Sequence, residues 1–223
     1  MLKPGLIVSC QAEEGSPFNS EAFIAAFAKA AELGGAAAVR LCGLGNIRAS
    51  RAAMGLPIIG ITKGRFPDGS VLITPTPEDA AAAAAAGADV VALDATARRR
   101  PCGLTGAEMI KAVKSRLVVP VMADVSTFEE GLAAAAAGAD YVGTTLSGYT
   151  PSTVREAGTG APDLDLVKRL AASLPGRVIA EGRIWTPEQA GEALRLGAFA
   201  VVVGTAITRP VDIIKRFAGA LRP

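Results

Sequence analysis

The sequence contains no histidine, only three cysteines and few aromatic residues, and each shortage excludes a class of function. Without histidine the chain can use neither Ser-His-Asp nor Cys-His catalysis, and it can form no histidine-bound zinc site. Any proton transfer must therefore use Lys, Glu, Asp, Tyr, Cys or water. Aromatic residues make up 4% of the chain and the formal net charge is +2. A nucleic-acid-binding protein would usually show a basic excess or an aromatic stacking surface, so we expect no nucleic-acid partner.

The cysteines and the apolar runs point to a cytoplasmic protein with no membrane partner. Cys10, Cys42 and Cys102 are widely spaced and odd in number, which disfavours a disulfide framework and a zinc knuckle. A reducing compartment fits this pattern. The longest nearly all-alanine run, residues 80–88, is too short to span a bilayer, which takes about 20 residues. Residues 7–10 look like a lipoprotein cleavage box, but their apolar lead-in is too short for a signal peptide.

A Gly-Ala turn followed by a β-rich run recurs four times along the chain. The turns begin at Gly35, Gly87, Gly138 and Gly197. Most of the runs are continuously apolar, as expected for a parallel sheet that is buried on both faces. Four further runs lie between these repeats, which gives eight expected strands at residues 6–11, 37–41, 58–63, 90–94, 119–124, 141–145, 178–181 and 200–204.

Helix signals separate the expected strands. Residues 76–78 and 186–188 are both Thr-Pro-Glu, which supplies a capping hydroxyl, a proline at the first helical position and an acid in the first turn. Ser126 with Glu129 is typical of a capping box. Eight strand–helix units predict one (β/α)8 barrel domain over residues 1–223, because this fold takes about 200–250 residues. An open doubly wound sheet is the alternative, but it would place a dinucleotide fingerprint after the first strand, where the sequence has none.

Almost every expected strand ends in a polar or ionisable residue, and these ends form the active-site face of a barrel. Strand ends also meet solvent and are often polar for that reason alone. A solvated rim would more often carry Ser, Asn or Gly, so the set as a whole indicates a site more strongly than any one member. In strand order the ends are Gln11, Arg40, Lys63, Asp94, Asp124, Thr144-Thr145, Glu181 and Gly204-Thr205.

Lys63 and Glu181 are the expected catalytic pair. They end the third and seventh strands, four apart in a ring of eight, so their side chains should face each other across the barrel mouth. Inverting a carbon requires a proton to leave one face and another to arrive at the opposite face, which suits two titratable groups on opposite walls. Arg40 would lower the pKa of Lys63 by like-charge repulsion. Two other roles for Lys63 remain open, an anchor for phosphate or carboxylate and a Schiff-base nucleophile.

A phosphate site is predicted at the last two strand ends. The seventh strand leads into Gly182 and Arg183, and the eighth leads into Gly204 and Thr205, with Arg209 close behind. In this fold the corresponding loops bind phosphate through backbone N–H groups and a helix N-terminus. Glycine lets the backbone approach the anion, and an arginine can add a bidentate contact. Alternatively, these glycines serve only to form tight turns, and no phosphate binds here.

Seven stretches of the chain resemble the bacterial N-acetylmannosamine-6-phosphate 2-epimerases, in order and at matching spacing, from about Gly5 to Phe217. The resemblance implies a cofactor-free interconversion of N-acetylmannosamine 6-phosphate and N-acetylglucosamine 6-phosphate, a step in sialic-acid breakdown. The most specific stretch is Gly-Leu-Ile-Val-Ser-Cys-Gln at residues 5–11, and the others are residues 57–63, 92–96, 122–124, 143–150, 178–182 and 203–209.

The resemblance also implies roles for the polar strand ends. The lysine and glutamate that end the third and seventh strands would be the catalytic pair. Gln11, Arg40 and Asp124 would hold the sugar, and we add Thr144 from the sixth strand end to this substrate-binding set. The last loop, with Arg209, would hold the phosphate. The sequence departs from the family where the catalytic lysine is followed by glycine and then arginine, rather than directly by arginine.

Two alternatives to an epimerase remain open. One is a Schiff-base aldolase or lyase that acts on a sugar phosphate, and the other is a catalytically silent sugar-phosphate-binding protein. In each case the expected partner is a small-molecule phosphosugar, and we expect a homodimer. We expect no metal and no nicotinamide cofactor, because the chain lacks histidine, clustered cysteines and a dinucleotide fingerprint.

Overall fold

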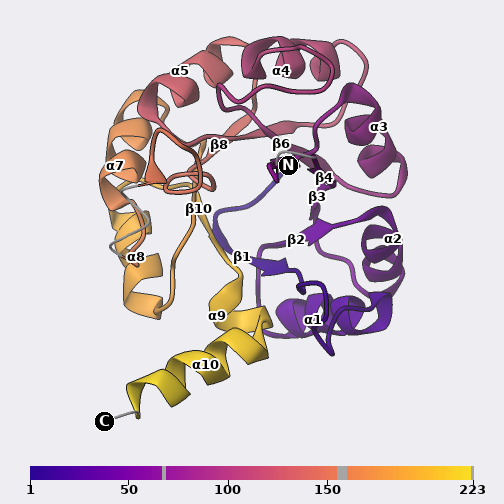
Figure 1. The fold of residues 1–223 in the computed structure, drawn as a ribbon, viewed down its shortest axis with the longest axis vertical. Coiled ribbons are helices and arrows are strands. Elements are labelled where there is room, and N and C mark those ends of the chain that lie inside the picture. Colours follow the sequence, from indigo (N-terminus) through magenta and orange to yellow (C-terminus); the bar gives the residue numbers. More distant parts are fainter. Residues whose placement is uncertain (67–68, 155–159, 222–223) are drawn as a thin grey trace.

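The computed structural model describes residues 1–66, 69–154 and 160–221, and its centre is a closed barrel of eight parallel strands (Figure 1). The first strand pairs with the last, so the two ends of the chain close the ring. The predicted (β/α)8 barrel is confirmed, and the open doubly wound sheet is wrong. Around the ring the strands are β1 (Gly5–Cys10), β10 (Ala200–Val203), β9 (Val178–Glu181), β8 (Tyr141–Gly143), β7 (Val121–Asp124), β6 (Val90–Asp94), β3 (Ile58–Ile61) and β2 (Ala38–Cys42).

Helices surround the barrel, and Figure 1 shows them as a ring outside the strands. No helix within the described ranges has both the length and the apolar character needed to cross a bilayer. The helices are α1 (Glu21–Leu33), α2 (Leu44–Ala53), α3 (Pro77–Ala85), α4 (Gly106–Lys114), α5 (Phe128–Ala136), α7 (Leu164–Ser173), α8 (Pro187–Arg195), α9 (Thr205–Thr208) and α10 (Pro210–Ala220).

The predicted helix boundaries are confirmed with one shift. Thr76 and Thr186 cap α3 and α8, and the four repeat glycines all have positive φ, the conformation that glycine adopts at low cost after a helix. The capping box of α5 is formed by Thr127 with Glu130, one residue later than the expected Ser126 pairing. The reason is that Thr127 has the extended backbone of an N-cap, while the Ser126 hydroxyl donates to the Glu130 carboxylate at 2.8 Å.

Along each strand, side chains alternate between the barrel interior and the layer under the helices. Ile7, Ile59, Met122 and Tyr141 belong to the cluster that fills the interior. Their neighbours in sequence, such as Val8, Ala123 and Val142, pack in a second cluster beneath the helices. Every second residue after an interior residue therefore points to the same side, and near the carboxyl end of a strand these side chains point into the barrel mouth.

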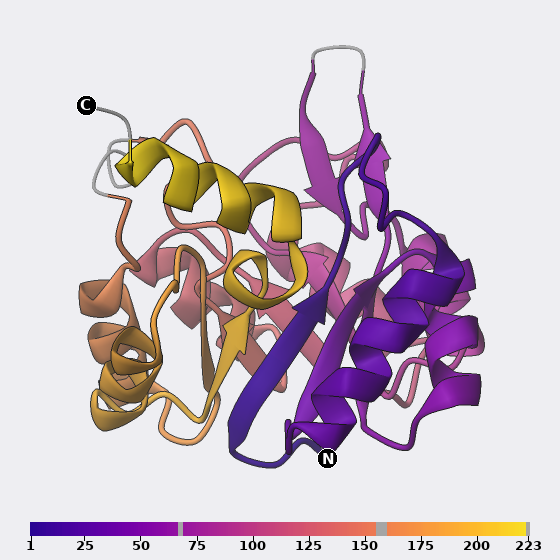
Figure 2. The same cartoon turned by 90° about the horizontal axis from the view of Figure 1, so that it is seen from below.

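The sequence did not predict a β-hairpin that follows the third barrel strand. That strand ends at Ile61, and the chain then forms β4 (Lys63–Arg65) and β5 (Val71–Ile73), in which Lys63 pairs antiparallel with Ile73. Figure 2 shows the hairpin projecting beyond one end of the barrel. Strands of three residues are too short to show a hydrophobic period, so the sequence pattern alone places Lys63 at the end of the barrel strand.

The last helix, α10, departs from the expected ring because it does not pack on the barrel wall. None of its residues is buried, and Figure 1 shows it pointing away from the barrel. Ile214 and Phe217 are 65% and 69% exposed. The helix is amphipathic in sequence, and these two apolar side chains stay largely uncovered within the described part of the chain.

Candidate active site

A cavity of about 340 Å³ opens at the carboxyl ends of the strands, where a barrel places its chemistry. It brings together nine of the eleven residues that the sequence predicted for the site. Those nine are Gln11, Arg40, Lys63, Glu181, Gly182, Arg183, Gly204, Thr205 and Arg209.

Arg40 is the buried centre of this site. Its guanidinium donates to both carboxylate oxygens of Asp124, with Nη2 to Oδ2 at 2.6 Å and Nη1 to Oδ1 at 3.1 Å. Nη1 also lies 3.1 Å from Oε2 of Glu181. A bidentate pair of this kind fixes the plane of the guanidinium. Asp124 is completely buried and is not among the residues that line the cavity, so in this structure its carboxylate holds Arg40 from beneath the cavity floor.

Lys63 reaches the cavity from the hairpin, and its Nζ donates to Oε1 of Gln11 at 2.9 Å. The pKa of Lys63 lies below its ordinary value, first because the cavity walls strip part of its hydration and also because Arg209 and Arg40 repel its charge. The predicted effect of Arg40 has the right direction, but desolvation is the larger cause. A lowered pKa makes the neutral amine, the form that can accept a proton, more available near neutral pH.

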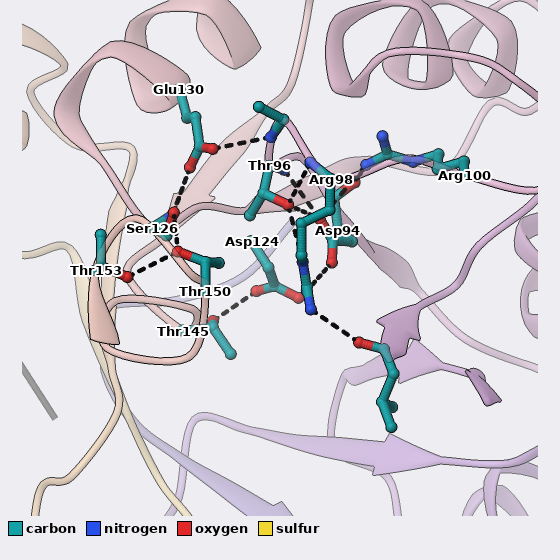
Figure 3. A network of polar contacts seen from close by, with 12 residues as sticks. Asp94, Thr96, Arg98, Arg100, Asp124, Ser126, Glu130, Thr145, Thr150 and Thr153 are labelled. Carbon is teal, nitrogen blue, oxygen red and sulfur yellow. Dashed lines mark hydrogen bonds and ion pairs between the residues drawn. The ribbon is translucent and has the colours of Figure 1, made fainter. Parts of the chain in front are cut away.

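The hairpin that carries Lys63 is fastened to the barrel by Arg98. Its Nη1 donates to the carbonyl of Val71 in β5 at 3.1 Å, and its Nη2 pairs with the carboxylate of Asp94 (Figure 3). Asp94 is completely buried at the end of β6, and its Oδ1 also accepts from Thr96 Oγ1 at 2.7 Å. Asp94, one of the polar strand ends, therefore anchors the hairpin and does not line the cavity.

The departure from the family pattern after Lys63 has a local cause. A Cβ atom at Gly64 would lie 2.9 Å from Cγ of Pro75 and 3.0 Å from the ring of Phe66. Contacts this short require the neighbours to move, so glycine fits this position beside the Phe66 ring. Arg65 is exposed on the hairpin and is not among the residues that line the cavity.

Glu181 ends β9, opposite β3 in the ring, and its side chain is 13% exposed. Burial raises the pKa of Glu181; Arg40 opposes this effect and the charge of Asp124 adds to it. The site thus contains an amine whose pKa is lowered and a carboxyl group whose pKa is raised, an arrangement found where protons are exchanged near neutral pH.

Thr145 lines the cavity, whereas the predicted Thr144 does not. The hydroxyl of Thr144 donates to the carbonyl of Glu181 at 2.9 Å and accepts from the Glu181 N–H at 3.0 Å, so it holds the backbone of β9. Oγ1 of Thr145 lies 2.6 Å from Oδ1 of Asp124 and 3.0 Å from Oε2 of Glu181. Strand alternation could have identified Thr145. It comes four residues after the interior residue Tyr141, so it lies on the same side of the strand.

The loops after β9 and β10 bring the expected glycines to the cavity, but the arginines of this region are already paired. Gly182 has a φ of 111°, which only glycine adopts without strain. Arg183 donates to the carbonyls of Ser147 and Ala161, so its side chain ties down the loop after β8. Arg209 Nη1 contacts Oε1 of Glu13 at 2.6 Å, in the loop after β1.

Two aromatic residues lie in the cavity wall that no sequence pattern indicated. Tyr149 is 56% exposed, and the guanidinium of Arg183 lies 5.7 Å from the centre of its ring. Trp185 lines the cavity and is covered by Arg216 of α10 at 4.5 Å. Single aromatic residues in loops carry no spacing signal, so sequence alone could not select them. Within the ranges that the structure describes, no three His, Cys, Asp or Glu side chains are grouped to hold a metal ion.

Comparisons with known proteins agree with this geometry. A family model described as "Putative N-acetylmannosamine-6-phosphate epimerase" matches residues 24–223. A relative from Caldanaerobacter subterraneus subsp. tengcongensis, named "Putative N-acetylmannosamine-6-phosphate 2-epimerase", is 50% identical over 97% of this chain and 90% of that protein. A relative with the same name from Cutibacterium acnes is 49% identical over 98% of this chain and 94% of that protein.

A solved structure of the N-acetylmannosamine-6-phosphate 2-epimerase from Clostridium perfringens has the same fold over nearly its whole length. It matches with a TM-score of 0.89 and 42% identity, over 97% of this chain and 93% of that chain. The resemblance identified in the sequence is thus confirmed over the full length of the barrel. The chain belongs to the N-acetylmannosamine-6-phosphate 2-epimerase family.

Proposed function

We propose that this protein is an isomerase that epimerises C2 of N-acetylmannosamine 6-phosphate to give N-acetylglucosamine 6-phosphate, in the breakdown of sialic acid and related amino sugars. The observation that carries the proposal is the shared cavity of Lys63 and Glu181, which project from opposite sides of the barrel mouth. The names of the relatives support the substrate.

The chemistry requires a base, an acid and a cation. In the open-chain sugar, C2 is next to the C1 carbonyl, so loss of its proton places negative charge on the carbonyl oxygen. Neutral Lys63 takes this proton on one face, and protonated Glu181 supplies one to C2 on the other face. Arg40, which is buried and held rigid by Asp124, stabilises the developing charge. Lys63 then releases its proton to solvent and Glu181 takes one up.

The proposal is tested by incubating the protein with N-acetylmannosamine 6-phosphate in D2O. The expected result is N-acetylglucosamine 6-phosphate with deuterium at C2, observed by proton NMR as loss of the C2 proton signal. An intact substrate would overturn the epimerase assignment and leave the silent binding protein. Covalent attachment of the sugar after borohydride reduction would instead support the Schiff-base alternative.

We propose that the phosphate binds at the Gly182 and Gly204 end of the cavity. The loop after β9 and the start of α9 both line this end, and the backbone N–H groups at the start of a helix have no partner within the helix. A Cβ atom at Gly204 would lie 3.2 Å from Cβ of Ser9, so this segment runs close to β1. Arg209 adds the cationic side chain, whereas Arg183 supports the loop.

Replacing Arg209 by alanine is expected to raise KM by about tenfold to a hundredfold with little change in kcat, since a charge-assisted hydrogen bond contributes roughly 1.5–3 kcal/mol. Steady-state kinetics with the phosphorylated sugar measure this effect. Glu13→Gln is the matched control, because it removes the carboxylate that pairs with Arg209 and leaves the arginine in place. Equal turnover of the unphosphorylated sugar by the unmodified protein would contradict the phosphate assignment.

We also propose a homodimer that buries the apolar face of α10. Ile214 and Phe217 lie one turn apart on this helix and are mostly exposed. Exposed apolar surface of this kind commonly marks an interface between subunits. Ile214→Asp combined with Phe217→Asp is expected to shift the protein from dimer to monomer in analytical ultracentrifugation. Lys215→Ala, on the same helix, is the control and should leave the mass unchanged, and a monomeric unmodified protein would refute this proposal.

A cytoplasmic location is proposed on the basis of the cysteines. All three are free, and Cys102 is exposed. Free thiols are the normal state in a reducing compartment. Fractionation of the native host, followed by detection of the protein in the cytoplasmic fraction, tests this location.

A further inference from the structure

The hydroxyl group of Thr145 lies between two carboxyl groups. Its Oγ1 is 2.6 Å from Oδ1 of Asp124 and 3.0 Å from Oε2 of Glu181. A threonine hydroxyl has one proton and two lone pairs, so it can donate to only one of these oxygens. The second contact is favourable only if that carboxyl group itself carries a proton and donates it to Oγ1.

Asp124 is the better acceptor for the proton of Thr145. It is completely buried and accepts two hydrogen bonds from the guanidinium of Arg40, which pairs with its negative charge. Its contact with Thr145 is also the shorter of the two. The lone pairs of Thr145 Oγ1 therefore face Glu181.

We propose that Glu181 is protonated in the resting protein and donates from Oε2 to Oγ1 of Thr145, so that Thr145 is a positioning residue that keeps Glu181 in its acid form. The catalytic meaning of this state depends on the proposed epimerase function, but the position of the proton does not. The chain of donors runs from Glu181 to Thr145 and from Thr145 to Asp124, which fixes the orientation of the Glu181 carboxyl group toward the cavity.

Charged groups on three other elements act on Glu181. Arg40 of β2 lies 3.1 Å from Oε2 and favours the ionised form, as does Lys63 of β4 when it is charged. Burial and the negative charge of Asp124 on β7 favour the protonated form. Because Arg40 already makes a bidentate pair with Asp124, its charge is shared between the two carboxyl groups. A hydroxyl that donated to Glu181 would lower the pKa of Glu181. In the proposed arrangement that proton goes to Asp124, and the hydroxyl instead accepts from the Glu181 acid.

The proton position is tested without substrate by titrating the Glu181 carboxyl in carbon-13-glutamate-labelled protein by NMR. Its resonance is assigned by its disappearance in Glu181→Gln, whose amide can also donate to Thr145. The midpoint should lie well above that of an ordinary glutamate. In Thr145→Val, which has nearly the same shape and no hydroxyl, the midpoint should fall by about one pH unit, the size of effect that loss of one hydrogen bond has.

The sign of that shift decides between the two arrangements. If Thr145 donated to an ionised Glu181, its removal would raise the midpoint, and the proposal would be overturned. Thr145→Ser keeps the hydroxyl and should retain the midpoint of the unmodified protein. If Thr145→Val does not fold, the unmodified protein still decides the matter, because an ordinary or lower midpoint for Glu181 contradicts a resting acid.

The same variants give a kinetic readout that a merely structural role would not change. The alkaline limb of kcat/KM reports the essential acid of the free enzyme. In Thr145→Val this alkaline limb should move to lower pH by the same amount as the NMR midpoint, and KM should stay nearly unchanged. In Thr145→Ser the limb should lie at the pH found for the unmodified protein. Absence of epimerase activity in the unmodified protein would overturn the proposed function, while the substrate-free titration would still test the proton position.

Discussion

Lys63→Ala is expected to lower kcat by about 10²–10⁴-fold, the contribution of a positioned general base. The side chain lines the cavity, and its pKa is lowered by desolvation and by the nearby arginines, so the neutral amine forms at lower pH than for an ordinary lysine. In the unmodified protein kcat/KM should therefore rise with pH as Lys63 loses its proton, below the ordinary lysine range. Steady-state kinetics and a pH profile measure both effects.

The control for this variant is Arg65→Ala. Arg65 is a cation on the same hairpin strand, but it is exposed and does not line the cavity, so its loss should leave kcat close to normal. The substrate should still bind to Lys63→Ala, because Arg40 and the phosphate end of the cavity are unchanged. A kcat near that of the unmodified protein in Lys63→Ala would refute its assignment as the base.

Glu181→Ala is expected to lower kcat by a similar factor of about 10²–10⁴, because the acid for the opposite face is lost. The double variant Lys63→Ala, Glu181→Ala should be little worse than either single variant, since residues that act as a unit give effects that do not add. Glu181→Gln is the matched control: it preserves shape and hydrogen bonding, and it should lose activity to the same degree if proton donation is the role. If Glu181→Ala remained active while Lys63→Ala did not, the lysine would serve both faces of C2.

The barrel was predictable because its signals are local and repeated. Threonine caps, Gly-Ala turns and short apolar runs each depend on a few neighbouring residues, and eight such units in 223 residues admit few architectures. The positions of Lys63 and Glu181 on opposite sides of the mouth followed from strand order alone, because a closed ring of eight places the third strand opposite the seventh.

The errors in the prediction occurred where the local signal was short or ambiguous. Strands of three residues show no period, so the hairpin that carries Lys63 was not recognised. Thr144 and Thr145 are adjacent and chemically identical, and only their alternation about β8 decides which one faces the cavity. The eighth strand–helix unit predicted a helix after the last strand, but nothing local in the sequence states which surface covers the apolar side chains of α10.

The sequence by itself determined the order of the eight barrel strands, the closed barrel and most of the polar residues at its mouth. Only the tertiary structure decided how these residues pair. Arg40 is held by Asp124, Arg183 supports a loop and Asp94 anchors the hairpin through Arg98. Thr145 joins Asp124 to Glu181 across two neighbouring strands. The physical reason is that secondary structure depends on contacts between near neighbours in sequence, whereas charge pairing and proton position depend on distances of about 3 Å between side chains from different strands.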